Sequence, residues 1–258
     1  MTQSLTLAFW PPNAPTLFSI AVESAKGIPG ANRAGGHKES LVSVVFAAAA
    51  LEAFLNETVY LAGGKSTLRA SHPAVVSAFA QVMEDAEESR AQIQAKFQLS
   101  KLVLTGKTYD KGVAPFQDFA DLIAVRNLLM HGHSNERFSR VEGNPVLINP
   151  ATVLDRLTRK NILHEAPPEP LKGFVAFVGE SFMAEAIYAD EMEGISPKDS
   201  GNRMMTRWTY VIGTRAVAEW ACNAASYMAM DFMDKAPAGR RKEIIEGQFR
   251  KAFSAPFK

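Results

Sequence analysis

The segment from Arg126 to His133, Arg-Asn-Leu-Leu-Met-His-Gly-His, combines side chains that could act on a phosphodiester. An arginine holds a phosphate through two hydrogen bonds and does not lose its charge. A histidine titrates near neutral pH and can move a proton. On a helix, Asn127 and His131 share one face because they are four residues apart, and Arg126 lies on the adjoining stripe. These residue types and their spacing indicate phosphate binding combined with proton transfer.

A structural role is the alternative for the same three residues. The helix expected around them is apolar on two sides, which is typical of a central, buried helix. Polar side chains in such a helix need hydrogen-bond partners. Arg126, Asn127 and His131 would then form a satisfied network in the core near the helix end, where His131 would also suit the helix dipole.

Three further polar residues are candidates for supporting roles. Glu52 and Asn56 lie four residues apart on an expected helix. They either orient Arg126 or His131, or form an exposed pair at the helix edge. His133 follows Gly132 and either assists binding or is a solvated residue in a turn.

Metal and cofactor sites have little support. Cys222 is the only cysteine, which excludes an intrachain disulfide and cysteine-based zinc or iron–sulfur sites within one chain. His37, His72 and His164 lack metal-ligand spacing. The stretch Gly27-Ile28-Pro29-Gly30 is not followed by Lys-Ser or Lys-Thr, so it is not a phosphate-binding P-loop. We therefore predict no metal and no cofactor.

Composition is that of an ordinary globular protein. The 258 residues are 47% hydrophobic and 21% charged, which excludes a disordered or collagen-like chain. With 28 Lys and Arg against 27 Asp and Glu, the net charge is +1, which excludes a broad basic coat but not a local basic site. The cluster Arg240-Arg241-Lys242 either contacts a phosphate backbone or is solvated.

The sequence shows neither a membrane helix nor a signal peptide. The apolar stretch Leu41–Leu51 ends at Glu52, short of the length that a membrane helix needs. We therefore expect a soluble, cytoplasmic protein without a membrane partner.

Apolar spacing of three and four residues predicts that the candidate residues lie on helices. The expected helices cover about residues 38–63, 74–104, 115–131, 150–163, 203–235 and 240–253. Residues 1–37, rich in glycine and proline, are predicted to form an irregular arm. Residues 137–200 are predicted to be an irregular insertion, with Gly143-Asn144 as a candidate β-hairpin turn.

The motif matches the Arg-Asn-x-x-x-His form of the Arg-x4-6-His motif of the HEPN superfamily (higher eukaryotes and prokaryotes nucleotide-binding). Leu51–Glu57 resembles the first-helix pattern of many HEPN proteins, and Phe116–Phe119 leading into the motif is similar too. Ala218–Ala221 resembles a late helix of several HEPN-like bacterial families. The resemblance covers roughly residues 38–135 and 203–237, outside the arm and the insertion.

This resemblance implies a mainly α fold: an antiparallel helical bundle over residues 38–258 that dimerises with its motifs facing each other. Catalytic members of the superfamily are metal-independent endoribonucleases, often toxins or defence effectors, whereas others are inactive binding or interaction modules. The chain has all three motif residues, Arg126, Asn127 and His131, and the resemblance implies catalytic roles for these three residues alone. The expected partners are RNA, a second copy of the chain and, for a toxin, an antitoxin protein.

Overall fold

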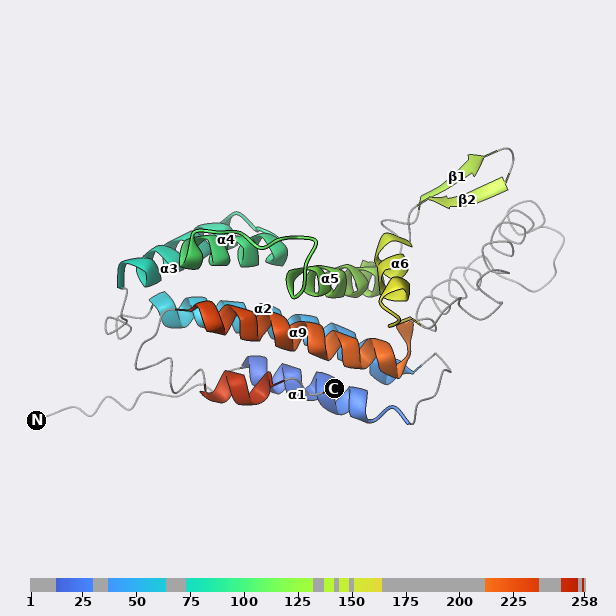
Figure 1. The fold of residues 1–258 in the computed structure, drawn as a ribbon, viewed down its shortest axis with the longest axis horizontal. Coiled ribbons are helices and arrows are strands. Elements are labelled where there is room, and N and C mark those ends of the chain that lie inside the picture. The colour runs from blue at the N-terminus through green and yellow to red at the C-terminus, as the bar shows by residue number, and fades with distance from the viewer. Residues whose placement is uncertain are drawn as a thin grey trace, which may run out of the picture.

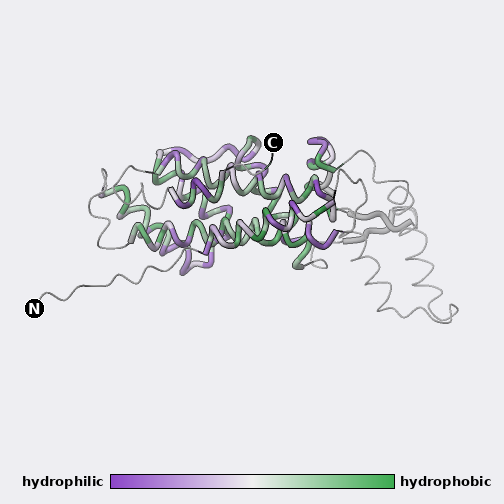
Figure 2. Tube along the Cα trace, turned by 90° about the horizontal axis from the view of Figure 1, so that it is seen from below, coloured by the Kyte–Doolittle hydropathy of each residue, from purple (hydrophilic) through white to green (hydrophobic). Residues whose placement is uncertain are grey.

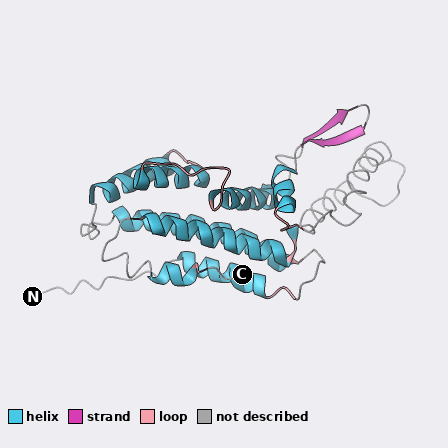
Figure 3. Cartoon of the chain, in the orientation of Figure 1, coloured by secondary structure: helices cyan, strands magenta, loops and turns pink. Residues whose placement is uncertain are grey.

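A computed structural model describes residues 13–29, 37–63, 73–131, 137–141, 144–148, 151–163, 212–236, 247–254 and 257, and this part of the chain is mainly helical (Figures 1 and 3). The helices are α1 (Asn13–Lys26), α2 (Lys38–Gly63), α3 (Pro73–Glu88), α4 (Ile93–Thr105), α5 (Phe116–His131), α6 (Ala151–Arg159) and α9 (Arg215–Lys235). The prediction of a mainly α protein with helical-bundle character is confirmed.

The helices form three layers (Figure 1). α2 and α9 pack against each other in the middle layer, between α3, α4 and α5 on one side and α1 on the other. A helical stretch at residues 247–252 lies in the same layer as α1. Hydrophobic and hydrophilic residues alternate along the helices (Figure 2), as expected where each helix buries one face.

Aromatic side chains connect the layers. The ring of Phe54 on α2 contacts that of Phe232 on α9 edge-on, with centroids 5.4 Å apart. Phe232 lies 6.1 Å from Phe97 on α4, which lies 4.8 Å from Phe119 on α5. These ring contacts set how α2, α9, α4 and α5 are aligned along their axes.

α2 and α9 run in the same direction, so the expectation of an antiparallel bundle is wrong for this pair. Their beginnings are joined by the Ser40 hydroxyl, which donates to the Ile212 carbonyl at 2.7 Å, and by the His37 N–H, which donates to the Gly213 carbonyl at 2.9 Å. Further along the two helices, Phe54 meets Phe232. A parallel pair needs a long connection, and here it spans the chain from α3 to α6 and beyond.

Helix α1 corrects the prediction of an irregular arm over residues 1–37. Ala14, Phe18, Ala21 and Ala25 are buried at helical spacing, and α1 packs on α2 and α9. The Glu57 carboxylate accepts hydrogen bonds from the first two N–H groups of α1 and so caps the helix. Residues 1–12 and 30–36 lie outside the described part.

The helix predicted over residues 74–104 is two helices. α3 ends in a Schellman motif: the Ala91 N–H donates to the Ala86 carbonyl at 2.8 Å, and the Arg90 N–H donates to the Glu87 carbonyl at 2.9 Å. Arg90 takes a left-handed conformation with φ of 55°. α4 ends at Thr105, one residue after the predicted end at 104, and Gly106 caps it with a φ of 73°.

The last long helix begins later than predicted. Thr214, not Arg203, starts it: the Thr214 hydroxyl accepts from the Val217 N–H at 3.3 Å. Its end at Lys235, before Pro237, is as predicted. In the C-terminal segment, Phe249 and Phe253 are buried against Phe54. The cluster Arg240-Arg241-Lys242 lies outside the described part.

The insertion contains an antiparallel two-stranded hairpin, β1 (Arg137–Val141) and β2 (Asn144–Ile148). Asn144 pairs with Val141, so residues 142–143 connect the strands and Asn144 belongs to β2 rather than to the turn. The hairpin leads to α6. Residues 164–200 lie outside the described part.

One helix in the described part of the chain, α2, is long and apolar enough to cross a membrane by length and composition. It meets this criterion because the helix continues past Glu52 to Gly63. In the structure its apolar residues Val44, Leu51 and Phe54 are buried among neighbouring helices, as in the core helix of a globular protein.

Candidate nucleic-acid site

α5 carries the candidate motif at its C-terminal end. Phe116, Phe119, Leu122 and Val125 are buried and anchor the helix to the core. The helix limits agree closely with the predicted range of about 115–131. The prediction of a central helix is wrong, because α5 lies in an outer layer and buries one side against α2 and α9. The motif begins one residue after Val125, so its backbone is placed by a well-packed helix.

Arg126 and Asn127 lie at the surface rather than in a sealed core. Asn127 is exposed, Arg126 is half-buried and Met130 is 55% exposed. The alternative of a buried, satisfied network is therefore wrong for Asn127. The Arg126 Nη1 donates to the Asn127 Oδ1 at 3.0 Å, which holds the two side chains together.

Within the described part of the chain, Arg126 has no carboxylate as an ion-pair partner. Its side-chain hydrogen bond goes to the neutral amide of Asn127. A guanidinium in this state can attract an anion from solvent.

The histidines of the candidate site are placed only in part. His131 is the last residue of α5, and its side chain lies outside the described part. His133 lies outside it too, as do His72 and His164. The structure therefore gives the backbone position of His131. Its role in proton transfer stays a prediction.

Glu52 and Asn56 are not brought to the motif within one chain. Both are exposed, and no hydrogen bond or ion pair among the described residues joins either to Arg126. They flank Phe54, which the chain of aromatic rings places level with Phe119 near the start of α5. Arg126 follows Phe119 by seven residues, or about 10 Å along the helix axis. This placement favours the exposed pair over an orienting role.

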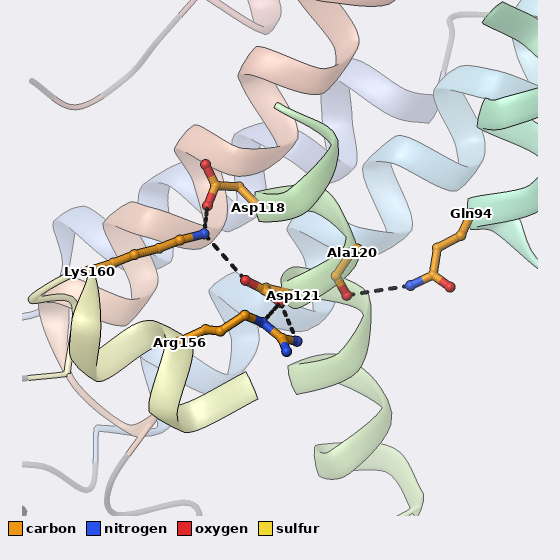
Figure 4. A network of polar contacts seen from close by, with 6 residues as sticks. All are labelled: Gln94, Asp118, Ala120, Asp121, Arg156 and Lys160. Atoms are coloured by element: carbon orange, nitrogen blue, oxygen red, sulfur yellow. Dashed lines mark hydrogen bonds and ion pairs between the residues drawn. The ribbon is translucent and has the colours of Figure 1, made fainter. Parts of the chain in front are cut away.

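A network of charged side chains joins α5 to the α6 region, and the sequence did not predict it (Figure 4). The carboxylate of Asp121 is buried, and its Oδ1 accepts from the Arg156 Nε at 2.7 Å and Nη2 at 2.6 Å. Lys160 Nζ donates to Asp118 Oδ1 at 2.5 Å and to Asp121 Oδ2 at 3.3 Å. Nearby, Gln94 on α4 donates to the Ala120 carbonyl at 3.4 Å.

Spacing was the one available signal for this network. Asp118 and Asp121 are three residues apart on α5. Arg156 on α6 and Lys160, the residue directly after α6, are four apart. Each pair therefore lies on one helix face. Sequence spacing does not indicate that the two faces meet.

The described residues offer little support for other chemistry. No group of three or more His, Cys, Asp or Glu side chains within the described ranges could hold a metal ion. Burial raises the pKa of the Cys222 thiol to about 12, with the Glu219 charge adding to the effect. Such a thiol is a poor nucleophile at neutral pH.

Comparisons with protein-family models, with curated proteins and with solved structures find no match for this chain. The functional interpretation thus depends on the motif and its surroundings. Near the end of α5, Asn127 and Met130 are exposed, and Arg126 is hydrogen-bonded to Asn127 with no ion pair to a described carboxylate. His131 follows as the last residue of the helix.

Proposed function

We propose that this chain is a HEPN-type, metal-independent endoribonuclease. The observation that carries the proposal is the half-exposed Arg126, whose guanidinium donates a hydrogen bond to the neutral amide of Asn127. Because no described carboxylate neutralises it, its charge is available for a phosphate. A bundle of helices that presents the motif at a helix end supports the same proposal.

In the proposed reaction, the ribose 2′-hydroxyl attacks the adjacent phosphorus, and the bond to the 5′-oxygen breaks. The 2′-hydroxyl loses its proton and the leaving 5′-oxygen gains one, which gives a 2′,3′-cyclic phosphate and a 5′-hydroxyl. Arg126 binds the phosphate and stabilises its developing charge. His131 moves protons, and Asn127 orients Arg126 through their hydrogen bond or contacts the phosphate. An internal nucleophile is favoured by proximity and needs no metal-bound water.

The proposed working form is a cytoplasmic homodimer with two motifs across one cleft. In such a dimer Glu52 and Asn56 could act on the motif of the second copy, since both are exposed. A ribonuclease of this kind suits a toxin or defence effector, with an antitoxin protein as partner in the toxin case.

The second candidate function is a non-catalytic HEPN module that binds a nucleotide, RNA or a partner protein. The same exposed Arg126 and Asn127 favour it, because phosphate binding alone needs no proton transfer. The two functions differ in whether RNA is cut.

The experiment that separates them incubates the purified protein with mixed RNA beside two variants. One is the double variant Arg126→Ala, His131→Ala. The other is Lys107→Ala, which removes an exposed charge in the loop before α5 and serves as the matched control. We expect cleavage by the wild type and the control and none by the double variant. RNA binding without cleavage by the wild type would favour the non-catalytic module.

A further inference from the structure

The start of α1 is held at the C-terminal part of α2. The Glu57 carboxylate on α2 accepts hydrogen bonds from the Asn13 and Ala14 N–H groups. Further along α1, the Ser43 hydroxyl near the beginning of α2 donates to the Ala21 carbonyl at 2.9 Å. The two helices therefore run antiparallel, and we expect the chain before Asn13 to continue past Glu57 toward the end of α2.

Two apolar side chains lie on α2 just beyond the start of α1. Leu61, four residues after Glu57, shares its helix face and is half-buried. Tyr60, three residues after Glu57, is a neighbour on the helix surface and is 83% exposed, the most of any large hydrophobic side chain in the described part. A helical side chain leans over the turn before its own Cα, so the Tyr60 ring lies toward the turn that carries Glu57. We call Tyr60 and Leu61 the α2 end patch.

The sequence before Asn13 is apolar and uncharged. Residues 5–12, which lie outside the described part, read Leu-Thr-Leu-Ala-Phe-Trp-Pro-Pro. Proline fixes its own φ and favours an extended residue before it, so we expect an extended chain from Trp10 to Asn13. Three residues of such a chain span about 9 Å. Because Tyr60 follows Glu57 by about 4.5 Å along the helix axis, Trp10 is within reach of Tyr60.

Connection and chemistry both favour this segment as the occupant of the α2 end patch. A segment attached a few residues away meets the patch at a high effective concentration that a separate molecule does not have. The patch has an aromatic ring and an aliphatic side chain, and Trp10 is an aromatic residue that can bury about 150–250 Å². The carboxylate beside the patch, Glu57, already holds α1, which leaves no free charge there for a charged partner.

We propose that residues 5–12 form a strap on the α2 end patch, with the Trp10 ring packed against the Tyr60 ring. The strap covers the hydrogen bonds between Glu57 and the start of α1 and excludes water from them. It is a separate feature from the Arg126 site and does not depend on the proposed ribonuclease activity.

A double-mutant cycle on the full-length protein tests the contact. Urea unfolding is measured for the wild type, Trp10→Ala, Tyr60→Ala and the double variant. We expect the two substitutions to be non-additive by about 3- to 10-fold in the unfolding equilibrium constant, as for other aromatic pairs. Tyr227→Ala on α9, where Tyr227 is 50% exposed, is the matched control. Its effect should add to that of Trp10→Ala within about twofold.

Cleavage by chymotrypsin after Leu7 or Phe9 gives a second measurement. The strap should be cut about tenfold more slowly than a free peptide of residues 1–12, and Tyr60→Ala should accelerate cleavage. Additive effects of Trp10→Ala and Tyr60→Ala would overturn the contact. Cleavage of the wild type as fast as of the peptide would overturn the strap. A coupling that grows with protein concentration would show that Trp10 packs on a second copy, which also overturns the strap within one chain.

Discussion

At the scale of single residues, Arg126 is the group on which the proposed activity depends most. Arg126→Ala should lower kcat/KM for RNA cleavage by about 10²–10³-fold, because one oriented donor to a developing charge is lost. Arg126→Lys should also be impaired, since an ammonium cannot make two parallel bonds to a phosphate. Cleavage rates of both variants, with Lys107→Ala as control, check this. An Arg126→Ala protein with the wild-type rate would refute the role.

Glu57 gives a second prediction at the residue scale. Burial raises its pKa above 4.5, although hydrogen bonds from the Asn13 and Ala14 N–H groups lower it in part. The folded state thus holds the proton more tightly than the unfolded state, so Glu57's contribution to the free energy of unfolding declines as pH rises from about 4.5 through the folded pKa.

Glu57→Gln keeps an oxygen that can accept from α1 and removes this pH dependence. Glu57→Ala removes the cap and should cost about 1 kcal/mol, with a larger loss at acidic pH than at neutral pH. Urea unfolding of the three proteins at acidic and neutral pH measures both effects. Equal destabilisation by Gln and Ala at neutral pH would show that the charge, rather than the acceptor oxygen, caps α1.

At the scale of elements, the end of α3 is defined by backbone conformation. A non-glycine residue in the left-handed region costs about 1–2 kcal/mol, and glycine avoids that cost but loses more entropy on folding. Arg90→Gly should therefore be neutral or stabilise by up to about 1 kcal/mol. Glu84→Gly, at an exposed position within α3, is the control and should cost about 1 kcal/mol. Thermal unfolding compares them, and a loss for Arg90→Gly equal to that of the control would contradict the assigned cap.

Helices with clear signals at both ends could be predicted from the sequence. α2 and α5 have the expected limits because glycines and a proline mark them. The α3–α4 break was missed because arginine at a left-handed position gives no local signal. α1 was missed because two prolines precede it and Pro15 lies in its first turn, and because its N-terminal cap is supplied by Glu57 from α2. For α1, contacts with residues distant in the sequence determine the helix, and a single sequence does not show those contacts.

The sequence predicted part of the candidate site as well. The residue types and spacing located Arg126 and Asn127, but exposure could not be inferred from a helix apolar on two sides. The Asp121 network depends on how α6 packs against α5, across the hairpin. A single sequence does not specify that packing.

At the scale of the whole molecule, we expect a homodimer of about twice 28.1 kDa. Two-fold pairing is the commonest assembly and would place two motifs across one cleft. Met130, 55% exposed beside the motif, would then be covered by the partner. Light scattering at tens of micromolar should show the dimer, and Met130→Asp should weaken it. A monomer in the wild type would count against a site composed of two chains.

The most direct measurement of the proposed function compares RNA with DNA of matched sequence, each incubated with the purified protein in excess EDTA. Because Arg126 supplies the positive charge at the phosphate and the ribose 2′-hydroxyl is the nucleophile, RNA should be cut to 2′,3′-cyclic phosphate and 5′-hydroxyl ends while DNA stays intact. Cleavage of DNA, or loss of RNA cleavage that returns on adding magnesium or manganese, would contradict the mechanism.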